Sequence, residues 1–193
     1  MDNDNRPTKY CYPYPHAAIT ADCIVFGYDP KKTLSVLLIK RRNEPYKDCW
    51  AFPGGFMEID EDLETCARRE VLEETGMALG EVFQFRCYST VDRDPRERIV
   101  TVVHFAFEPL AEVKGSDDAS EARWFNIDDL PQLAFDHRTI IDELFEFLED
   151  IIYNDLFFKY SPELLPIDAL SKLYDDILQL KKPERTPIDD DEL

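Results

Sequence analysis

Apolar and β-branched residues gather in short runs that polar turn residues separate. The runs Ala17–Gly27 and Leu34–Lys40 flank the turn signal Tyr28–Lys32, and this pattern predicts a β-hairpin. Further runs of the same kind predict three later strands, at Val82–Thr90, Ile99–Glu108 and Ala122–Phe125.

Three other segments predict helices. The first spans about Asp62–Thr75, and Gly76 follows it as the expected C-cap. The second runs from Phe135 to Tyr153, with Asp136 as a candidate N-cap. Its broad apolar face predicts packing on the preceding domain, and consists of Ile140, Ile141, Leu144, Phe145, Phe147, Leu148, Ile151 and Ile152. A third helix is predicted at Ile167–Leu180.

The composition is that of a soluble globular protein, with 193 residues of which 44% are hydrophobic and 33% charged. We expect a main domain at residues 1–127, a C-terminal helical extension at 128–180, and an acidic, disordered tail at 181–193. No apolar run approaches membrane-spanning length, and Met1–Tyr10 is too polar for a secretory signal. We therefore expect a cytoplasmic protein without a membrane partner.

The stretch Gly54–Met77, which reads GGFMEIDEDLETCARREVLEETGM, carries the candidate chemistry. Glu70, Glu73 and Glu74 are three and four positions apart, so a helix presents them on one face within a single turn. Carboxylates that lie so near to each other raise one another's pKa and need a compensating positive charge. Hard divalent cations supply it, and the pattern predicts a site for Mg²⁺ or Mn²⁺ that also engages a phosphate.

Three neighbours of the glutamates support this interpretation. Arg69 precedes the cluster and can clamp a carboxylate in a bidentate pair. Gly54 and Gly55 are expected to let the preceding loop turn sharply and bring backbone carbonyls near the metal. The alternative is a solvated acidic helix face, which would not require this loop, this arginine and this spacing together.

The stretch resembles the Nudix box, G-x5-E-x7-R-E-U-x-E-E-x-G-U, where U is a bulky aliphatic residue. The matching positions are Gly55, Glu61, Arg69, Glu70, Val71, Glu73, Glu74, Gly76 and Met77. The resemblance implies an α/β Nudix fold, a mixed sheet sandwiched between helices, here with a C-terminal helical extension. It also implies a hydrolase that cleaves a nucleoside diphosphate linked to another moiety with a metal-activated water.

The resemblance also implies roles for individual residues. Glu70, Glu74 and the backbone carbonyl of Gly54 correspond to metal ligands, and Glu73 to a further ligand, direct or through water. Arg69 belongs to the same catalytic set, and Glu61 would stabilise the box. The general base differs between branches of the family, so Glu70, Asp118 and Glu121 all stay open as candidates.

Basic residues suggest where the substrate binds. The loop Asp92–Arg98 holds three arginines in an otherwise acidic protein, and it is either a phosphate or ribose contact or a solvated turn. Arg41 lies at the end of the second strand, and Phe52 flanks the glycines as core support or ligand contact. We take Arg41, Arg93, Arg96 and Phe52 as substrate-binding candidates.

Longer stretches resemble the ADP-ribose pyrophosphatase-like branch, namely LLIKRRNEPYKDCWAFPGGFMEIDE, VDRDPRERIV and DDASEARWF. That resemblance implies a small-molecule substrate, ADP-ribose, cleaved to AMP and ribose 5-phosphate. Another nucleotide sugar, a dinucleoside polyphosphate or an oxidised nucleotide remains the alternative within the same chemistry.

A rival hypothesis comes from the C-terminal third. LLPIDALSKLYDDIL resembles the start of the winged helix in Nudix-related regulators that sense ADP-ribose and bind DNA. The resemblance stops at Lys181, where a recognition helix and wing would follow. Residues 128–193 carry 6 basic and 18 acidic residues, a net charge of −12, and the whole chain stands at −19. Such a surface repels DNA, so we expect no direct nucleic-acid partner.

Two features stay open in the sequence. The aromatic arm Tyr10–Pro15 could stack on adenine, pack across a dimer or tie the N-terminus to the core. The family resemblance favours a homodimer. His137 opens the C-terminal helix, where it is either structural or a ligand contact.

Overall fold

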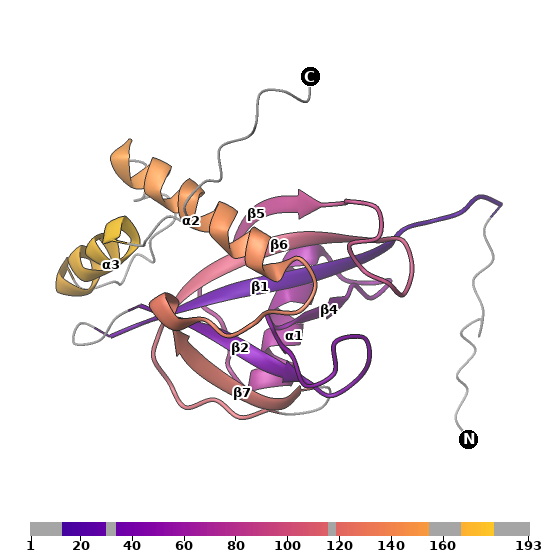
Figure 1. Ribbon diagram of the computed structural model, residues 1–193, viewed down its shortest axis with the longest axis horizontal. Coiled ribbons are helices and arrows are strands. Elements are labelled where there is room, and N and C mark those ends of the chain that lie inside the picture. Colours follow the sequence, from indigo (N-terminus) through magenta and orange to yellow (C-terminus); the bar gives the residue numbers. More distant parts are fainter. Residues whose placement is uncertain (1–12, 30–33, 116–118, 155–166, 180–193) are drawn as a thin grey trace, which may run out of the picture.

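The computed structural model describes residues 13–29, 34–115, 119–154 and 167–179. Within these ranges, seven strands form one mixed sheet in the order β3-β2-β1-β6-β5, with β4 beside β1 and β7 beside β2 (Figure 1). The strands are β1 Ala18–Tyr28, β2 Ser35–Arg41, β3 Trp50–Ala51, β4 Gly54–Phe56, β5 Phe83–Tyr88, β6 Ile99–Pro109 and β7 Ala119–Asn126. β1 and β6 run parallel, whereas the other strand pairs are antiparallel. The predicted hairpin and α/β class are confirmed.

The sheet forks between β1 and β2. These strands pair only near the hairpin turn, where Phe26 faces Val36 and Gly27 faces Ser35. Further along, β1 takes β4 as its partner while β2 pairs with β3 and β7. Backbone amides that leave one partner must find another, so each branch is completed by its own short strand. The fork positions the site described below.

Helix α1, Leu63–Thr75, covers one face of the sheet. Asp62 caps its N-terminus by accepting a hydrogen bond from the Thr65 amide at 2.8 Å. Gly76 ends it with φ of +74°, a left-handed conformation that glycine adopts without a steric penalty, so the predicted C-cap is confirmed. The apolar side of α1 packs on β1 and β2 through Cys66, Ala67 and Val71 against Ala21, Cys23, Val25 and Leu37.

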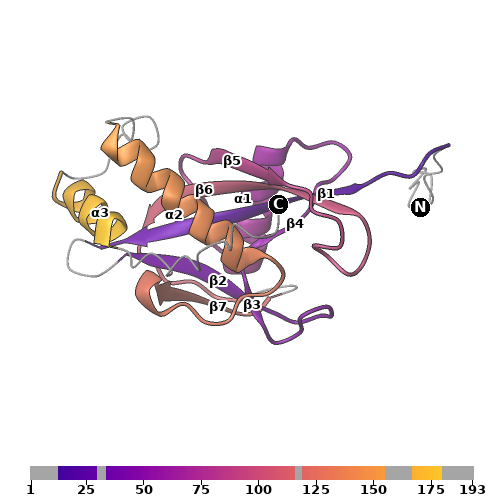
Figure 2. The ribbon, with the colours of Figure 1, turned by 45° about the horizontal axis from the view of Figure 1, so that its top comes forward.

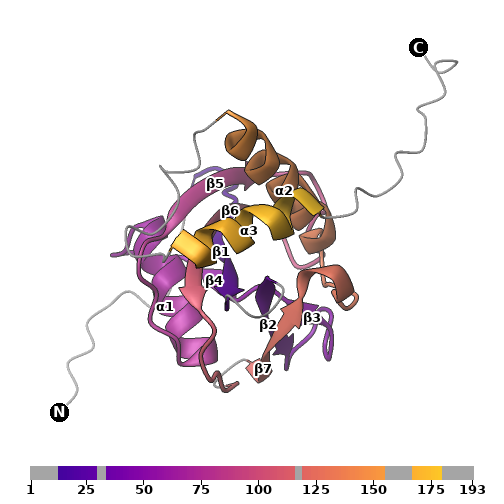
Figure 3. The same ribbon diagram turned by 90° about the vertical axis from the view of Figure 1, so that its left-hand side faces the viewer.

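The C-terminal helices cover the opposite face (Figure 3). They are α2, His137–Tyr153, and α3, Ile167–Gln179, with a short 3-10 helix η1, Ile127–Asp129, after β7. Side chains alternate along a strand, so Ile24 and Phe26 of β1 join the cluster under α2 while their neighbours face α1. Ile140, Ile141, Leu144, Leu148 and Ile151 of α2 are buried in this cluster, and the predicted packing of the apolar helix face is confirmed.

The prediction that Gly54 and Gly55 form a sharp turn is wrong. Both lie in the short strand β4, paired with Asp22 and Ala21 of β1, and neither has a positive φ. Glycine is required there by close approach: a Cβ on Gly54 would lie 2.5 Å from the Ala21 carbonyl oxygen, and one on Gly55 would collide with the Glu70 carboxylate. The missing side chains let β4 fit between β1 and α1.

Asp136 takes the N-cap position of α2, but its side chain makes no cap hydrogen bond. Its carboxylate instead accepts two hydrogen bonds from Arg93, at 2.9 and 2.6 Å. A guanidinium offers a charged, bidentate partner that a backbone amide cannot match. The predicted capping role is therefore replaced by an ion pair that joins α2 to the loop before β6.

Several predicted segments lie outside the described residues: the arm up to Tyr12, Asp118, Leu180 and the tail at 181–193. Among the helices of the described ranges, none combines the length and apolar character that crossing a membrane requires.

Candidate active site

A cavity of about 430 Å³ opens in the fork of the sheet. Thr20 and Asp22 of β1 form one side with β4, while Ile39 and Arg41 of β2 form the other with β3. The remaining walls come from α1 (Arg69, Glu70, Glu74), from the loop between β5 and β6 (Arg93, Asp94, Arg96), and from the segment entering α2 (Phe135, His137). The Ala134 amide donates to the Trp50 carbonyl at 2.7 Å, which holds this last segment beside β3 (Figure 2).

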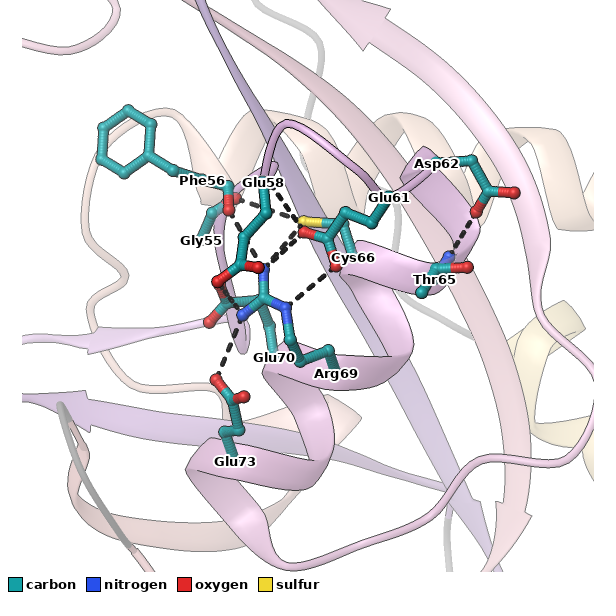
Figure 4. A network of polar contacts seen from close by, with 10 residues as sticks. All are labelled: Gly55, Phe56, Glu58, Glu61, Asp62, Thr65, Cys66, Arg69, Glu70 and Glu73. Carbon is teal, nitrogen blue, oxygen red and sulfur yellow. Dashed lines mark hydrogen bonds and ion pairs between the residues drawn. The ribbon is translucent and has the colours of Figure 1, made fainter. Parts of the chain in front are cut away.

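Arg69 is the centre of a hydrogen-bond network on α1 (Figure 4). Its Nε and Nη2 donate to the two carboxylate oxygens of Glu61 at 3.0 and 2.7 Å, which is the bidentate clamp that the sequence predicted. Hydrogen bonds from Arg69 lower the pKa of Glu61 to about 2, and the Glu58 amide adds to the effect. In return, the Glu61 carboxylate raises the pKa of Arg69. Glu61 thus stays ionised near neutral pH and holds the Arg69 guanidinium in place.

The anchored arginine orients the next carboxylate. Its Nη1 donates to Glu70 Oε1 at 2.7 Å, and Glu70 is directed at the backbone of Gly55. Burial raises the pKa of Glu70 even though Arg69 opposes the shift. Glu74, which is 6% exposed, lies one turn further along α1 and accepts a hydrogen bond from the Gly54 amide at 3.0 Å.

Glu73 lies differently from the other two. Its side chain is 46% exposed, against 15% for Glu70, and pairs with Arg69 Nη1 at 3.1 Å. It is not among the residues that line the cavity. Across the described ranges, no three acidic, histidine or cysteine side chains converge as a metal centre. Glu70 and Glu74 are the pair that α1 presents to the cavity.

The donor set at this wall fits a hard divalent cation. Glu70 and Glu74 supply carboxylate oxygens, and the glycines of β4 let the strand approach these side chains closely, so that the Gly54 amide donates to Glu74. Oxygen donors of this kind, completed by water and substrate phosphate, suit Mg²⁺ or Mn²⁺.

The opposite wall holds four arginines in two different states: Arg93 and Arg96 pair with carboxylates, whereas Arg41 and Arg42 bond backbone carbonyls, Arg42 Nη2 donating to the Ala119 carbonyl at 3.3 Å. Arg93 is 4% exposed and fully engaged by Asp136, and Arg96 makes a bidentate pair with Asp94 at 3.0 and 2.7 Å. Within the described residues Arg41 has no carboxylate partner; its Nε donates to the Pro45 carbonyl at 2.8 Å. Burial, aided by the nearby charge of Arg96, lowers the pKa of Arg41. Arg41 is therefore a half-buried cation with donors available to an anion.

Aromatic rings cover this wall. The centroid of the Phe135 ring lies 4.9 Å from Cζ of Arg41 and 5.8 Å from Cζ of Arg96, so the ring contacts two guanidinium groups. Phe135 has φ of +52°, a conformation that is rare for a bulky residue and costs free energy. Tyr46 packs on its ring at 4.6 Å. Together these residues form a cationic and aromatic surface next to the acidic wall.

Comparison with known proteins identifies the family. A model of the NUDIX domain matches residues 17–144. This chain belongs to the NUDIX family. The predicted Nudix hydrolase is thereby confirmed, and NUDIX hydrolases generally use divalent metals.

Two relatives extend the comparison. The ADP-ribose pyrophosphatase of Methanocaldococcus jannaschii is 42% identical over 130 residues, which are 67% of this chain and 74% of the relative. The ADPR-responsive transcriptional repressor NtrR of Acinetobacter baylyi is 33% identical over 171 residues, 86% of this chain and 68% of the repressor.

Solved structures show the same NUDIX fold. A MutT/nudix family protein from Enterococcus faecalis superposes with a TM-score of 0.78 at 28% identity, covering 90% of this chain and 78% of the other. The NUDIX domain of Shewanella oneidensis NrtR complexed with ADP ribose superposes with a TM-score of 0.66 at 29% identity, covering 77% and 99%.

The three candidates for the general base differ in where they lie relative to the cavity. Glu70 lines it, whereas Glu121 lies on β7 opposite Lys40, outside the lining residues, with its carboxylate engaged by Arg123. Asp118 lies outside the described residues. Of the substrate-binding candidates, Arg41, Arg93, Arg96 and Phe52 all line the cavity.

Asp22 is a lining residue that the sequence interpretation missed. It is the single charged side chain in the apolar run of β1, and Thr101 Oγ1 donates to its Oδ2 at 2.6 Å. A lone carboxylate in a buried strand is a usable signal, because burying it unpaired costs free energy. Its position opposite Gly54 became evident only through the pairing of β1 with β4.

Proposed function

We propose that this NUDIX protein hydrolyses ADP-ribose to AMP and ribose 5-phosphate with Mg²⁺ or Mn²⁺. The proposal rests mainly on one cavity that joins two carboxylates of α1, Glu70 and Glu74, to the guanidinium of Arg41, which has no carboxylate partner among the described residues. A diphosphate has charge for both walls, and a nucleoside has a ring for the aromatic surface. The 42% identity to an ADP-ribose pyrophosphatase supports this substrate.

The cation would be held by Glu70, Glu74 and the Gly54 carbonyl, with Glu73 as a further ligand through water. When bound, it neutralises the diphosphate and increases the acidity of a bound water. Arg41 binds a phosphate oxygen from the opposite wall and fixes the diphosphate across the fork. Arg69, anchored by Glu61, holds the Glu70 carboxylate toward the cavity.

Glu70 is the proton acceptor that we favour for the attacking water. Of the candidates within the described residues, Glu70 lines the cavity, whereas the Glu121 carboxylate lies outside it and pairs with Arg123. Arg69 keeps the carboxylate in place throughout.

A panel of diphosphate substrates with Mg²⁺ or Mn²⁺, read by mass spectrometry of the products, tests the proposal. ADP-ribose should give AMP and ribose 5-phosphate, with little turnover after chelation. Turnover confined to another nucleoside diphosphate would remove ADP-ribose and leave the chemistry. Absence of turnover on every substrate would refute an active hydrolase.

The second candidate function is a non-catalytic ADP-ribose sensor. One observation favours it: the match to the repressor NtrR spans 86% of this chain, more than the NUDIX domain alone. Against DNA binding stands the net charge of −12 over residues 128–193. We therefore expect no binding of DNA from the protein's own operon region at physiological salt, with or without ADP-ribose. Submicromolar, specific binding in a mobility-shift titration would favour the sensor.

We also infer a cytoplasmic homodimer. Tyr14 is 78% exposed and Ile19 40% exposed at the start of β1, which leaves apolar surface beside the N-terminal arm. Sedimentation should show a dimer at micromolar concentration, and a monomer would refute this inference.

A further inference from the structure

His137 is a buried histidine whose two ring nitrogens have different surroundings. It is the first residue of α2, is 3% exposed, and lines the cavity. Its ring stacks on Phe52 with a centroid distance of 4.6 Å and an interplanar angle of 7°. The Phe52 amide donates to His137 Nδ1 at 3.1 Å. Stacking and hydrogen bond together fix the plane of the imidazole.

The hydrogen bond also fixes the tautomer. A backbone amide can only donate, so Nδ1 must be the unprotonated acceptor and Nε2 must carry the proton. Burial lowers the pKa of His137, and the cations Arg93 and Arg41 act in the same direction while Asp22 and Asp136 oppose it. The ring is neutral, with one N–H donor at Nε2.

That donor faces the cavity. In the ranges that the structure describes, Nε2 of His137 has no hydrogen-bond partner. Yet no fully buried side-chain nitrogen or oxygen in those ranges lacks a partner. Nε2 must therefore border open space, and the space that His137 borders is the cavity. A buried donor left without an acceptor costs free energy, which a ligand oxygen would recover.

The backbone places this donor near the acidic wall. Phe52 donates to His137, and Gly54 donates to Glu74 Oε2 at 3.0 Å. Two residues of extended chain span at most about 7 Å, which is therefore the greatest separation of the Phe52 and Gly54 amide nitrogens that make these two contacts. An oxygen reached by Nε2 is consequently close to the diphosphate.

We propose that His137 is a substrate-positioning residue whose Nε2–H donates to an oxygen of the diphosphate–ribose unit, either a phosphate oxygen or a sugar hydroxyl. The assignment rests on the proposed function for the identity of the substrate. We expect this hydrogen bond to stabilise the bound substrate and the transition state equally. Its loss should therefore raise KM more than it lowers kcat.

Two substitutions test the hydrogen bonds of the two ring nitrogens one at a time. In His137→Asn, the shorter amide places its oxygen near the position of Nδ1, so it can still accept from Phe52 but cannot reach the cavity. In His137→Gln, the longer amide places its nitrogen near the position of Nε2, so it can still donate to the cavity but abandons Phe52. The neighbouring exposed variant Arg138→Gln controls for changes at the start of α2.

The KM for ADP-ribose should rise about threefold to tenfold in His137→Asn, with kcat nearly constant, as expected for one neutral hydrogen bond. His137→Gln should recover most of that loss although its melting temperature falls. A purely structural histidine would give the reverse order, with Asn benign and Gln impaired, and would overturn the proposal. Equal KM values in all variants would overturn it as well.

Binding calorimetry in the presence of a chelator identifies which substrate oxygen accepts the hydrogen bond from Nε2. It also distinguishes a failure of this inference from a failure of the proposed function. Weaker binding of both ADP-ribose and inorganic diphosphate by His137→Asn would assign a phosphate oxygen. Weaker binding of ADP-ribose and ribose 5-phosphate, with diphosphate unchanged, would assign a sugar hydroxyl. If the wild type neither binds nor cleaves ADP-ribose, the proposed function fails, and the ranking of Asn and Gln is then decided on the diphosphate substrate that it does cleave.

Discussion

The two walls of the cavity are built in different ways. The acidic wall comes from one continuous stretch, Gly54 to Gly76, in which a strand, a loop and α1 bring Arg69 to Glu70 and Glu74. The opposite wall is assembled from separate segments, with contributions from β2, from the loop before β6 and from the segment entering α2.

Their electrostatics differ as well. Arg69 pairs with Glu61, Glu70 and Glu73, while Glu70 and Glu74 line the acidic wall, so negative charge remains in excess there for a cation. On the opposite wall, Arg93 and Arg96 are neutralised by Asp136 and Asp94, whereas Arg41 and Arg42 have no carboxylate partner among the described residues. The candidate metal ligands therefore come from one local motif, while the candidate substrate contacts come from segments that are distant in the sequence and meet only in the folded protein.

The largest expected effect is on the acidic wall. Glu74→Gln keeps an oxygen that can accept from the Gly54 amide, so the fold should persist, but it removes a charge that faces the cavity. We expect turnover to fall at least about a hundredfold, the scale of losing about 2.7 kcal/mol of transition-state stabilisation. Calorimetry should show weaker Mn²⁺ binding. Near-normal turnover would refute the assignment of Glu74 as a ligand.

Glu73→Gln is the matched comparison on the same helix. Glu73 is half-exposed and lies outside the cavity lining, so its loss should cost turnover roughly tenfold or less, about 1.4 kcal/mol. Equal losses in Glu73→Gln and Glu74→Gln would show that Glu73 matters as much as Glu74 for turnover, and would favour direct ligation over the contact through water that the family resemblance also allowed.

On the opposite wall, Arg93→Gln should mainly lower stability. It leaves the Asp136 carboxylate without its bidentate partner beside buried residues, which costs about 1.5–3 kcal/mol of unfolding free energy. Denaturant unfolding measures this change, and the midpoint should fall with little change in slope. A variant of native stability with raised KM would instead make Arg93 a substrate contact.

Arg41→Gln should show the converse. Because Arg41 has no carboxylate partner in the described residues, its loss leaves no buried anion unpaired. KM for ADP-ribose should rise about tenfold, or about 1.4 kcal/mol, with stability changed by less than about 1 kcal/mol. Unchanged KM would show that the cationic wall contacts the substrate elsewhere.

The last prediction concerns the pH dependence of stability. The pKa of Glu61 is about 2 in the folded protein, below its ordinary value of 4.5. Its contribution to stability is therefore fully present above pH 4.5 and is lost as pH falls from 4.5 toward 2. Glu61→Gln should flatten that part of the stability profile, read by thermal melting between pH 3 and pH 7. Parallel profiles would show that Arg69 holds Glu61 only weakly.

Much of the fold could be predicted from local patterns. The hairpin, the box helix with its Gly76 cap and the apolar face of α2 follow from residues close in sequence, whose propensities act within a few positions. The prediction of a glycine turn was wrong because Gly54 and Gly55 are needed for contacts with other segments: β1 and Glu70 occupy the space that a side chain would fill. Asp136 likewise lost its cap role to Arg93, a partner 43 positions away.

The sequence by itself determined the acidic wall, since a helix fixes the relative directions of residues three and four apart whatever surrounds it. Only the tertiary structure decided which of those glutamates lines the cavity, which of the lining arginines pair with carboxylates, and that His137 borders the same cavity. Pairing of charges and access to solvent depend on segments distant in the chain, and neither is encoded in the spacing of any one of them.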